Sequence, residues 1–136
     1  MIVESDIQDV EPEAWVIAAT GLRDAGLVSA DWLSAVDRGG KLEILLHLCA
    51  PGSGREALVR TVVSIDSPRI ASLVSLFPGV NWHERETAEM FGVEFQGRST
   101  TEPLLLRTPV DQPPLRRDSS LPERVDKPWP GAQEKE

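Results

Sequence analysis

The pattern of apolar and polar residues predicts three strands in the first half of the chain. The segments 27–37, 41–50 and 56–66 are rich in apolar and β-branched residues, and short glycine-containing loops separate them. In the middle segment every second residue is apolar, which indicates one buried face. These residues are Leu42, Ile44, Leu46 and Leu48. Because loops this short join antiparallel neighbours, we predict an antiparallel meander.

Three further segments carry helical signals. The segment 12–26 has proline and acidic residues at its start and glycine at its end. The segment 68–77 follows a serine, begins with proline and has apolar residues at helical spacing. The segment 81–91 begins with asparagine, places Glu84 as its capping-box partner and is followed by Gly92. We therefore predict an α+β fold in which helices cover an antiparallel sheet of three to four strands.

Prolines concentrate in the C-terminal part of the chain. Seven of the eleven prolines lie beyond Phe95, a density that neither a helix nor an inner strand tolerates. Apolar residues such as Leu106 and Leu115 continue through this part, although a solvated linker usually carries few of them. We therefore predict an α+β core domain over residues 1–102 and an extended Pro-rich, partner-docking tail over residues 103–136.

The composition is acidic and includes a single cysteine. The 136 residues contain 14 Lys and Arg against 22 Asp and Glu, a formal net charge of −8, which disfavours binding to nucleic acid or anionic lipid through a broad positive surface. Because Cys49 is the only cysteine, the chain alone forms no internal disulfide and ligates no iron–sulfur cluster. No apolar run approaches the roughly 20 residues that cross a bilayer, so we expect neither membrane insertion nor export through a signal peptide.

The segment 81–89 contains half of a zinc motif. It reads Asn-Trp-His-Glu-Arg-Glu-Thr-Ala-Glu, and His83 followed by Glu84 begins the helical motif of zinc hydrolases. The second histidine of that motif, one turn later, is replaced by Thr87. Neutral nitrogen ligands are the main requirement of such a site, so we assign no metal ligand. A metal-dependent hydrolase centred on His83 and Glu84 is kept as an alternative.

Three carboxylates in the same segment could form an acid–base pair. They belong to Glu84, Glu86 and Glu89, and Arg85 lies between two of them. Carboxylates one turn apart on a short helix are usually solvated, and an arginine among them more often organises a charge network than transfers protons. We therefore interpret the group as structural and assign no catalytic residue.

Three segments together resemble a known family. They read Trp-His-Glu-Arg-Glu at 82–86, Glu-Met-Phe-Gly-Val at 89–93 and Pro-Leu-Arg-Arg-Asp at 114–118. Their order and spacing resemble the C subunit of proton-translocating NADH:quinone oxidoreductase, respiratory complex I, a module also found in related membrane-bound hydrogenase complexes. The resemblance implies that the family signature consists of Trp82, Glu84, Arg85, Glu86, Met90, Phe91 and Gly92. It also implies that the residues that dock on a partner are Pro114, Leu115, Arg116, Arg117 and Asp118.

The resemblance implies a non-catalytic subunit of the hydrophilic arm. Such a subunit holds no cofactor, and its partner subunits hold iron–sulfur clusters and FMN, or a nickel–iron centre. The implied partners are the large quinone-site or hydrogenase-like subunit and the small iron–sulfur subunit, which this chain would scaffold for electron transfer from NADH to quinone. The implied location is cytoplasmic, peripheral to the inner face of the cell membrane through the complex. The equivalent accessory subunit of a membrane-bound nickel–iron hydrogenase is the alternative.

Overall fold

The computed structural model describes residues 7–98, 102–107 and 110–120. Over these residues the chain has the predicted α+β fold, with two α-helices, a four-stranded sheet and a two-stranded sheet. The elements in chain order are β1 (Ile7–Asp9), the 3-10 helix η2 (Pro12–Ala14), α1 (Trp15–Asp24), β2 (Ser29–Asp37), β3 (Lys41–Ala50), β4 (Arg55–Ser64), β5 (Arg69–Ala71), α2 (Val80–Phe91) and β6 (Glu94–Gln96).

The larger sheet is mixed. Its strand order is β1-β4-β3-β2, and β2, β3 and β4 form the predicted antiparallel meander, in which Leu46 lies opposite Leu33 and Val59. The short strand β1 pairs with β4 in parallel, so the prediction of a purely antiparallel sheet was wrong. A parallel pair needs a long crossover connection, and here α1, β2 and β3 all lie between the two strands in the sequence.

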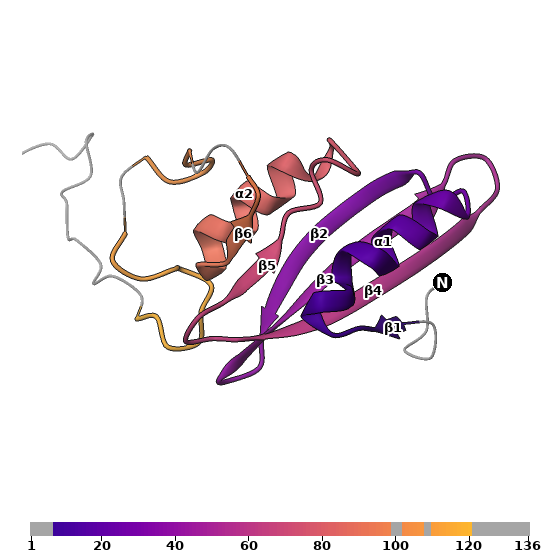
Figure 1. The fold of residues 1–136 in the computed structure, drawn as a ribbon. Helices are drawn as coiled ribbons and strands as arrows, with labels where there is room; N and C mark the ends of the chain where they lie inside the picture. Colours follow the sequence, from indigo (N-terminus) through magenta and orange to yellow (C-terminus); the bar gives the residue numbers. More distant parts are fainter. Residues whose placement is uncertain (1–6, 99–101, 108–109, 121–136) are drawn as a thin grey trace, which may run out of the picture.

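Both helices contribute to one core on the same face of this sheet. The inward-facing residues of β3 are Leu42, Ile44, Leu46 and Leu48, all fully buried. Trp15 and Ala19 of α1 join them in a single cluster with Phe91 of α2. Figure 1 shows α1 lying over β3 and β4, with α2 on the side of β2. This burial of one strand face confirms the interpretation of the alternating pattern.

The segment 68–77 does not form the predicted helix. Arg69–Ala71 is the strand β5, which pairs in parallel with β6 and places Ile70 opposite Phe95. The turns that follow bury Leu73 completely. Pairing with β6 satisfies backbone groups that a helix would have satisfied internally. The apolar spacing of this segment therefore reflects burial in the core and not helical periodicity.

The other two predicted helices are confirmed, with differences at their starts. The segment 12–26 forms η2 followed by α1. The N-cap of α2 is Gly79, with no side-chain cap hydrogen bond, so the predicted capping box of Asn81 and Glu84 is wrong. None of the helices in the described residues is long and apolar enough to cross a bilayer.

Candidate functional site

The signature residues lie on two sides of α2. The residues that face the core are Val80, Glu84, Thr87, Met90 and Phe91, which recur at spacings of three and four. On the outer side Glu86 is exposed, and Trp82 has 60% of its surface exposed. The helix ends at Gly92, whose φ of 75° is the left-handed conformation that glycine adopts without strain. One helix therefore combines core residues with an accessible face.

Glu84 is fully buried, which corrects the prediction of a solvated carboxylate. Its Oε2 accepts a hydrogen bond from Ser72 Oγ at 2.7 Å, and its Oε1 accepts one from the backbone N–H of Leu73 at 2.7 Å. Burial raises the pKa of Glu84 above its usual 4.5, although both hydrogen bonds and the positive charge of Arg98 act to lower it. The carboxylate thus connects α2 to the turn that follows β5.

Arg85 binds the backbone at the predicted boundary between the core domain and the tail. Its Nε donates to the carbonyl oxygen of Glu102 at 3.1 Å, and its Nη2 donates to that of Pro103 at 2.7 Å. The guanidinium carbon also lies 5.1 Å from the centroid of the Trp82 ring, a cation–π contact. The sequence had suggested a charge network with the neighbouring carboxylates, but Arg85 directs these donors to carbonyl groups instead.

Glu89 makes a contact that sequence reasoning missed. Its two carboxylate oxygens accept hydrogen bonds from the backbone N–H groups of Leu105, at 2.7 Å, and Leu106, at 2.9 Å. The proline-rich run was the available signal for this contact. Its backbone N–H groups have few partners in regular secondary structure, so a helix carboxylate can accept hydrogen bonds from them. Together, Arg85 and Glu89 hold both sides of residues 102–106 against α2.

The segment 113–117 lies across the end of α2. The backbone N–H of Leu115 donates to the carbonyl of Met90 at 3.0 Å. Pro113 lies against Gly92 so closely that a Cβ added to the glycine would be 2.9 Å from Pro113 Cγ. Arg116 donates through Nη2 to a backbone carbonyl at the end of β4, that of Ile65. The structure therefore brings the predicted docking residues and the signature helix together within one molecule.

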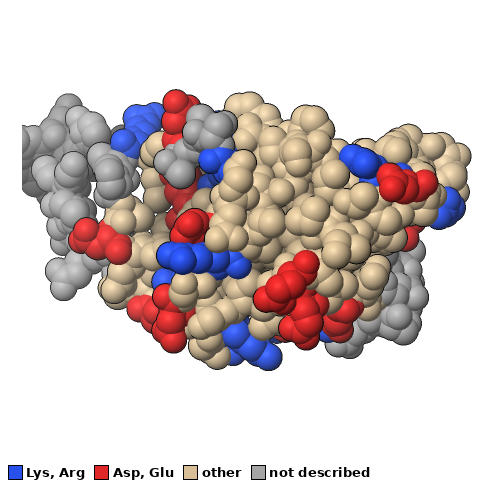
Figure 2. All heavy atoms as spheres, viewed as in Figure 1, with Lys and Arg blue, Asp and Glu red and all other residues tan. Residues whose placement is uncertain are grey.

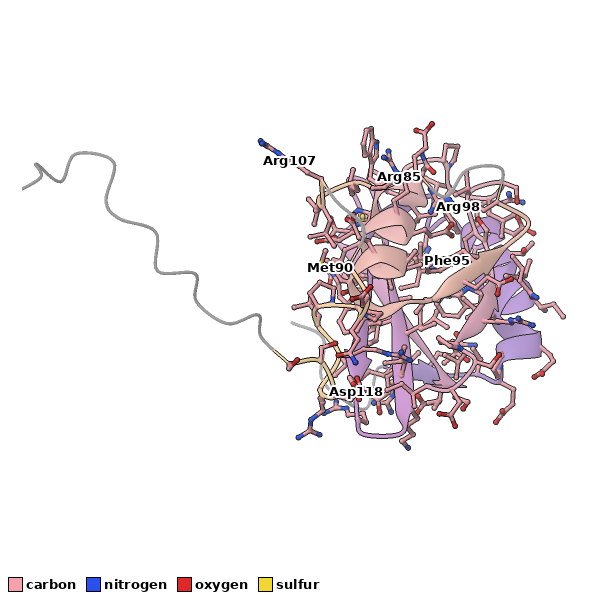
Figure 3. The ribbon with its side chains drawn as sticks, turned by 90° about the vertical axis from the view of Figure 1, so that its left-hand side faces the viewer. Arg85, Met90, Phe95, Arg98, Arg107 and Asp118 are labelled. Carbon is pink, nitrogen blue, oxygen red and sulfur yellow. The ribbon has the colours of Figure 1, made fainter. Side chains whose placement is uncertain are left out.

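The last residue of β2, Asp37, completes this attachment. Asp37 accepts a hydrogen bond from the backbone N–H of Arg117 at 2.8 Å and another from that of Gly39 at 2.7 Å. These two hydrogen bonds hold the pKa of Asp37 below its usual 3.8, and the nearby positive charges of Arg117 and Arg116 add to the effect. Pro114 and Asp118 are exposed to solvent. Figure 3 shows Asp118 near the lower end of the sheet and Arg107 extending away from the body.

The attachment through Asp37 gives a pH-dependence that can be measured. A carboxylate with a lowered folded-state pKa stabilises the fold above its unfolded pKa, here 3.8, and this contribution is lost as the pH falls through the lower folded value. We expect Asp37→Asn to show a shallower loss of stability than the unsubstituted chain as the pH falls from about 5. Chemical denaturation across this pH range measures it. Asp66→Asn, which removes an exposed carboxylate, is the control, and equal slopes for Asp37→Asn and the unsubstituted chain would contradict the assignment.

A pocket of about 460 Å³ opens between α2, β6 and residues of the segments 102–106 and 110–113. Its walls include Ala88, Val93, Phe95 and Leu106, and its lining also contains charged residues of both signs. Phe95 lies near α2, below Arg85 and Arg98, in Figure 3. The described residues contain no group of three or more His, Cys, Asp or Glu side chains placed to hold a metal ion.

Apolar side chains remain exposed on α2 and along the segment that packs on it. Large fractions of their surfaces are accessible: Trp82 60%, Leu105 56%, Leu115 56% and Val110 47%. We call these four residues the exposed apolar set. On the face shown in Figure 2, Lys and Arg side chains lie in small groups beside Asp and Glu, and no broad basic area is visible. The surface around α2 therefore combines exposed apolar side chains with charges of both signs.

The fold and the site define an α+β domain whose C-terminal segment packs on a helix and leaves apolar residues exposed, a class typical of subunits in larger assemblies. The chain belongs to the family described as "Respiratory-chain NADH dehydrogenase, 30 Kd subunit", whose model matches residues 8–125. The resemblance noted from the sequence is thereby confirmed. The matched range includes α2, the segment packed on it and all of the predicted docking residues.

Relatives with similar sequences carry the corresponding names. The C subunit of the NADH-quinone oxidoreductase of Roseiflexus castenholzii is 33% identical over 121 residues, which cover 82% of this chain and 68% of that protein. The C/D subunit of the NADH-quinone oxidoreductase of Citrobacter koseri is 33% identical over 88 residues, which cover 65% of this chain but 14% of that much longer protein.

Solved structures share the fold. A trypsin-resistant fragment (1-134) of Nqo5 matches with a TM-score of 0.62 and 20% identity, over 72% of this chain and 81% of the fragment. A chain of the membrane-bound sulfane sulfur reductase, an archaeal respiratory membrane complex, matches with a TM-score of 0.74 and 22% identity, over 85% of this chain and 71% of that one. At these identities the likeness establishes the architecture alone.

Proposed function

We propose that this chain is a cofactor-free subunit of an NADH:quinone oxidoreductase of the complex I type. Its role is to scaffold the large quinone-site subunit and the small iron–sulfur subunit, so that electrons pass from NADH to quinone through cofactors in its partners. Those cofactors are iron–sulfur clusters and FMN. The complex would hold the chain at the cytoplasmic face of the membrane. Family membership supports the assignment to this type of complex.

The observation that carries the scaffolding role is the exposed apolar set. Leu115 has 56% of its surface exposed, although its backbone is fixed to Met90. An exposed apolar side chain on a fixed backbone favours association, because no backbone conformational entropy is lost when a partner covers the side chain. The C/D relative supports contact with a large subunit, since sequence similar to this chain forms part of a longer single chain there.

The proposal is tested by affinity purification of the full chain, tagged and expressed in its own host. We expect the large quinone-site subunit and the small iron–sulfur subunit to co-purify, with iron–sulfur clusters and FMN in the captured complex. Capture of a nickel–iron subunit instead would favour the alternative, an accessory subunit of a membrane-bound hydrogenase. Purification without any redox subunit would contradict both.

A substitution in the exposed apolar set sharpens this test. Leu115→Asp places a charge where the proposal requires an apolar contact, and we expect it to reduce the co-purified partner at least tenfold, since a central apolar contact contributes about 2 kcal/mol or more. The matched control is Ile17→Asp, because Ile17 lies on α1 and has 74% of its surface exposed. Equal loss of partner for the two variants would count against a contact at Leu115. Circular dichroism checks that both variants are folded.

A further inference from the structure

We propose that the pocket between α2 and the segments 102–106 and 110–113 receives an apolar side chain of a neighbouring polypeptide, with a lysine or arginine beside it. This inference rests on the proposed function, since it specifies the chemistry of the partner segment that contacts this chain. The pocket's volume, about 460 Å³, falls in the range of roughly 300–1,000 Å³ that is typical of binding pockets.

The apolar part of the pocket comes from three elements. Ala88 on α2 contributes only a methyl group, which leaves space beside the helix. Val93, just before β6, and Phe95, within β6, are almost fully buried and also line the pocket. Val110 lies at the wall and has 47% of its surface exposed, so part of the apolar lining faces water. An apolar side chain that enters this space removes that lining from water, which is favourable.

The charges around the pocket favour a basic neighbour. The two arginines of the lining direct donors back to the chain: Arg85 to the carbonyls of residues 102 and 103, and Arg98 to Asn81 Oδ1 at 2.8 Å. In contrast, the side chains of Glu102 and Asp111 are exposed, and no side chain in the described part of the molecule pairs with them.

The remaining two carboxylates of the lining already have partners. Glu89 accepts hydrogen bonds from the backbone N–H groups of residues 105 and 106, and Glu94 forms an ion pair with Arg69 at 2.9 Å. Hydrogen bonds to neutral oxygens leave the positive charges of Arg85 and Arg98 in place, but the lining holds four carboxylates against these two arginines and Arg69, the partner of Glu94. A negative excess therefore remains, and among the described residues the lining carboxylates that lack a partner are Glu102 and Asp111. With a chain charge of −8, this arrangement attracts a cationic segment and repels an acidic one.

Site-specific photo-crosslinking in the assembled complex tests the partner's chemistry. A photoreactive residue replaces Val110 in the full chain, and mass spectrometry identifies the attached peptide after irradiation. We expect crosslinks to a partner peptide in which an apolar residue stands next to Lys or Arg. The control position is Ile17, on α1, which we expect to give no crosslink to that peptide. Crosslinks from position 110 only to this chain itself, or to a partner segment without a basic residue, would overturn the inference.

Charge reversal tests the electrostatic part. We expect Glu102→Lys combined with Asp111→Lys to reduce the amount of co-purified partner about fivefold, with a weakened dependence on salt. The matched control, Glu11→Lys combined with Glu13→Lys, makes the same change in net charge at exposed residues near the start of α1. Equal binding by both double variants would refute the basic neighbour. Capture of redox subunits by the unsubstituted chain tests the proposed function separately. If the unsubstituted chain captures them but the crosslinking or charge-reversal result is negative, only the inference about the pocket fails.

Discussion

Replacing Glu84 with alanine is expected to lower the free energy of unfolding by about 3 kcal/mol. The substitution leaves the buried N–H of Leu73 without its acceptor at 2.7 Å and removes the acceptor of Ser72 Oγ. A buried donor without a partner costs about 1–3 kcal/mol, and the cavity left by the side chain adds to this. Denaturant titration of the variant and the unsubstituted chain measures the difference.

Glu84→Gln is the matched control for this prediction. The amide has the same shape, its oxygen can accept from Leu73 and its nitrogen can donate to Ser72 Oγ, so we expect a cost below about 1 kcal/mol. A glutamine variant as unstable as the alanine variant would show that the negative charge itself is required. An alanine variant as stable as the unsubstituted chain would contradict the role of Glu84 altogether.

The charge of Glu84 also gives the glutamine comparison a defined pH-dependence. Because burial raises the pKa of Glu84, the folded state binds a proton more readily than the unfolded state between pH 4.5 and the folded pKa. Stability from this group is therefore highest below pH 4.5 and falls as the pH rises through the folded pKa. We expect the free energy of unfolding of the unsubstituted chain, relative to that of Glu84→Gln, to decrease as the pH rises from 4.5 through the folded pKa.

Replacing Gly92 with alanine is expected to release the segment 113–117 from the core. The new Cβ would lie 2.9 Å from Pro113 Cγ, so the proline must move. Because Pro113 lies two residues before Leu115, we expect its displacement to break the hydrogen bond from the Leu115 N–H to the Met90 carbonyl. We expect hydrogen exchange at the Leu115 amide to become at least tenfold faster, because the protection given by about one hydrogen bond is lost. Trypsin should also cleave faster after Arg116.

Gly52→Ala separates this steric effect from backbone strain. Gly52 has a φ of 80°, close to the 75° of Gly92, but no atom lies within 4 Å of its added Cβ. Both variants should therefore lose about 1 kcal/mol from the left-handed conformation, while only Gly92→Ala should expose the tail segment. If both variants expose it equally, the contact between Gly92 and Pro113 has no part in holding the segment.

The strands were predictable because their signal is local. The alternation in β3 has the period of a strand with one buried face, and glycine-containing loops mark both ends of the segment. The same reasoning failed at residues 68–77, because the apolar spacing of Leu73 and its neighbours fits either a helix or an irregular buried segment. Pairing of β5 with β6, more than twenty residues later in the sequence, decided between them.

The candidate site was predictable only as a set of residue types. The signature and docking residues could be identified through the family resemblance, and the match over residues 8–125 confirms the family. Their individual roles as signature and docking residues, and the boundary at residue 102, stay predictions. The contacts of Glu84 could not be predicted from the sequence, since a carboxylate on a short helix looks the same whether it is solvated or bound to distant backbone. For Glu89 the proline-rich run indicated that backbone N–H groups needed acceptors, but it did not identify which carboxylate would accept from them.

The sequence by itself determined the α+β class, the meander, the α2 helix and membership of the family, because these depend on periodicity and on residue identities at fixed spacing. Only the tertiary structure decided that β1 adds in parallel, that Glu84 is buried and that the C-terminal segment packs on α2. These features depend on hydrogen bonds between groups far apart in the chain, such as Asp37 and Arg117, 80 residues apart. No local pattern encodes such a pairing, since its free energy exists only after the core has brought both groups together.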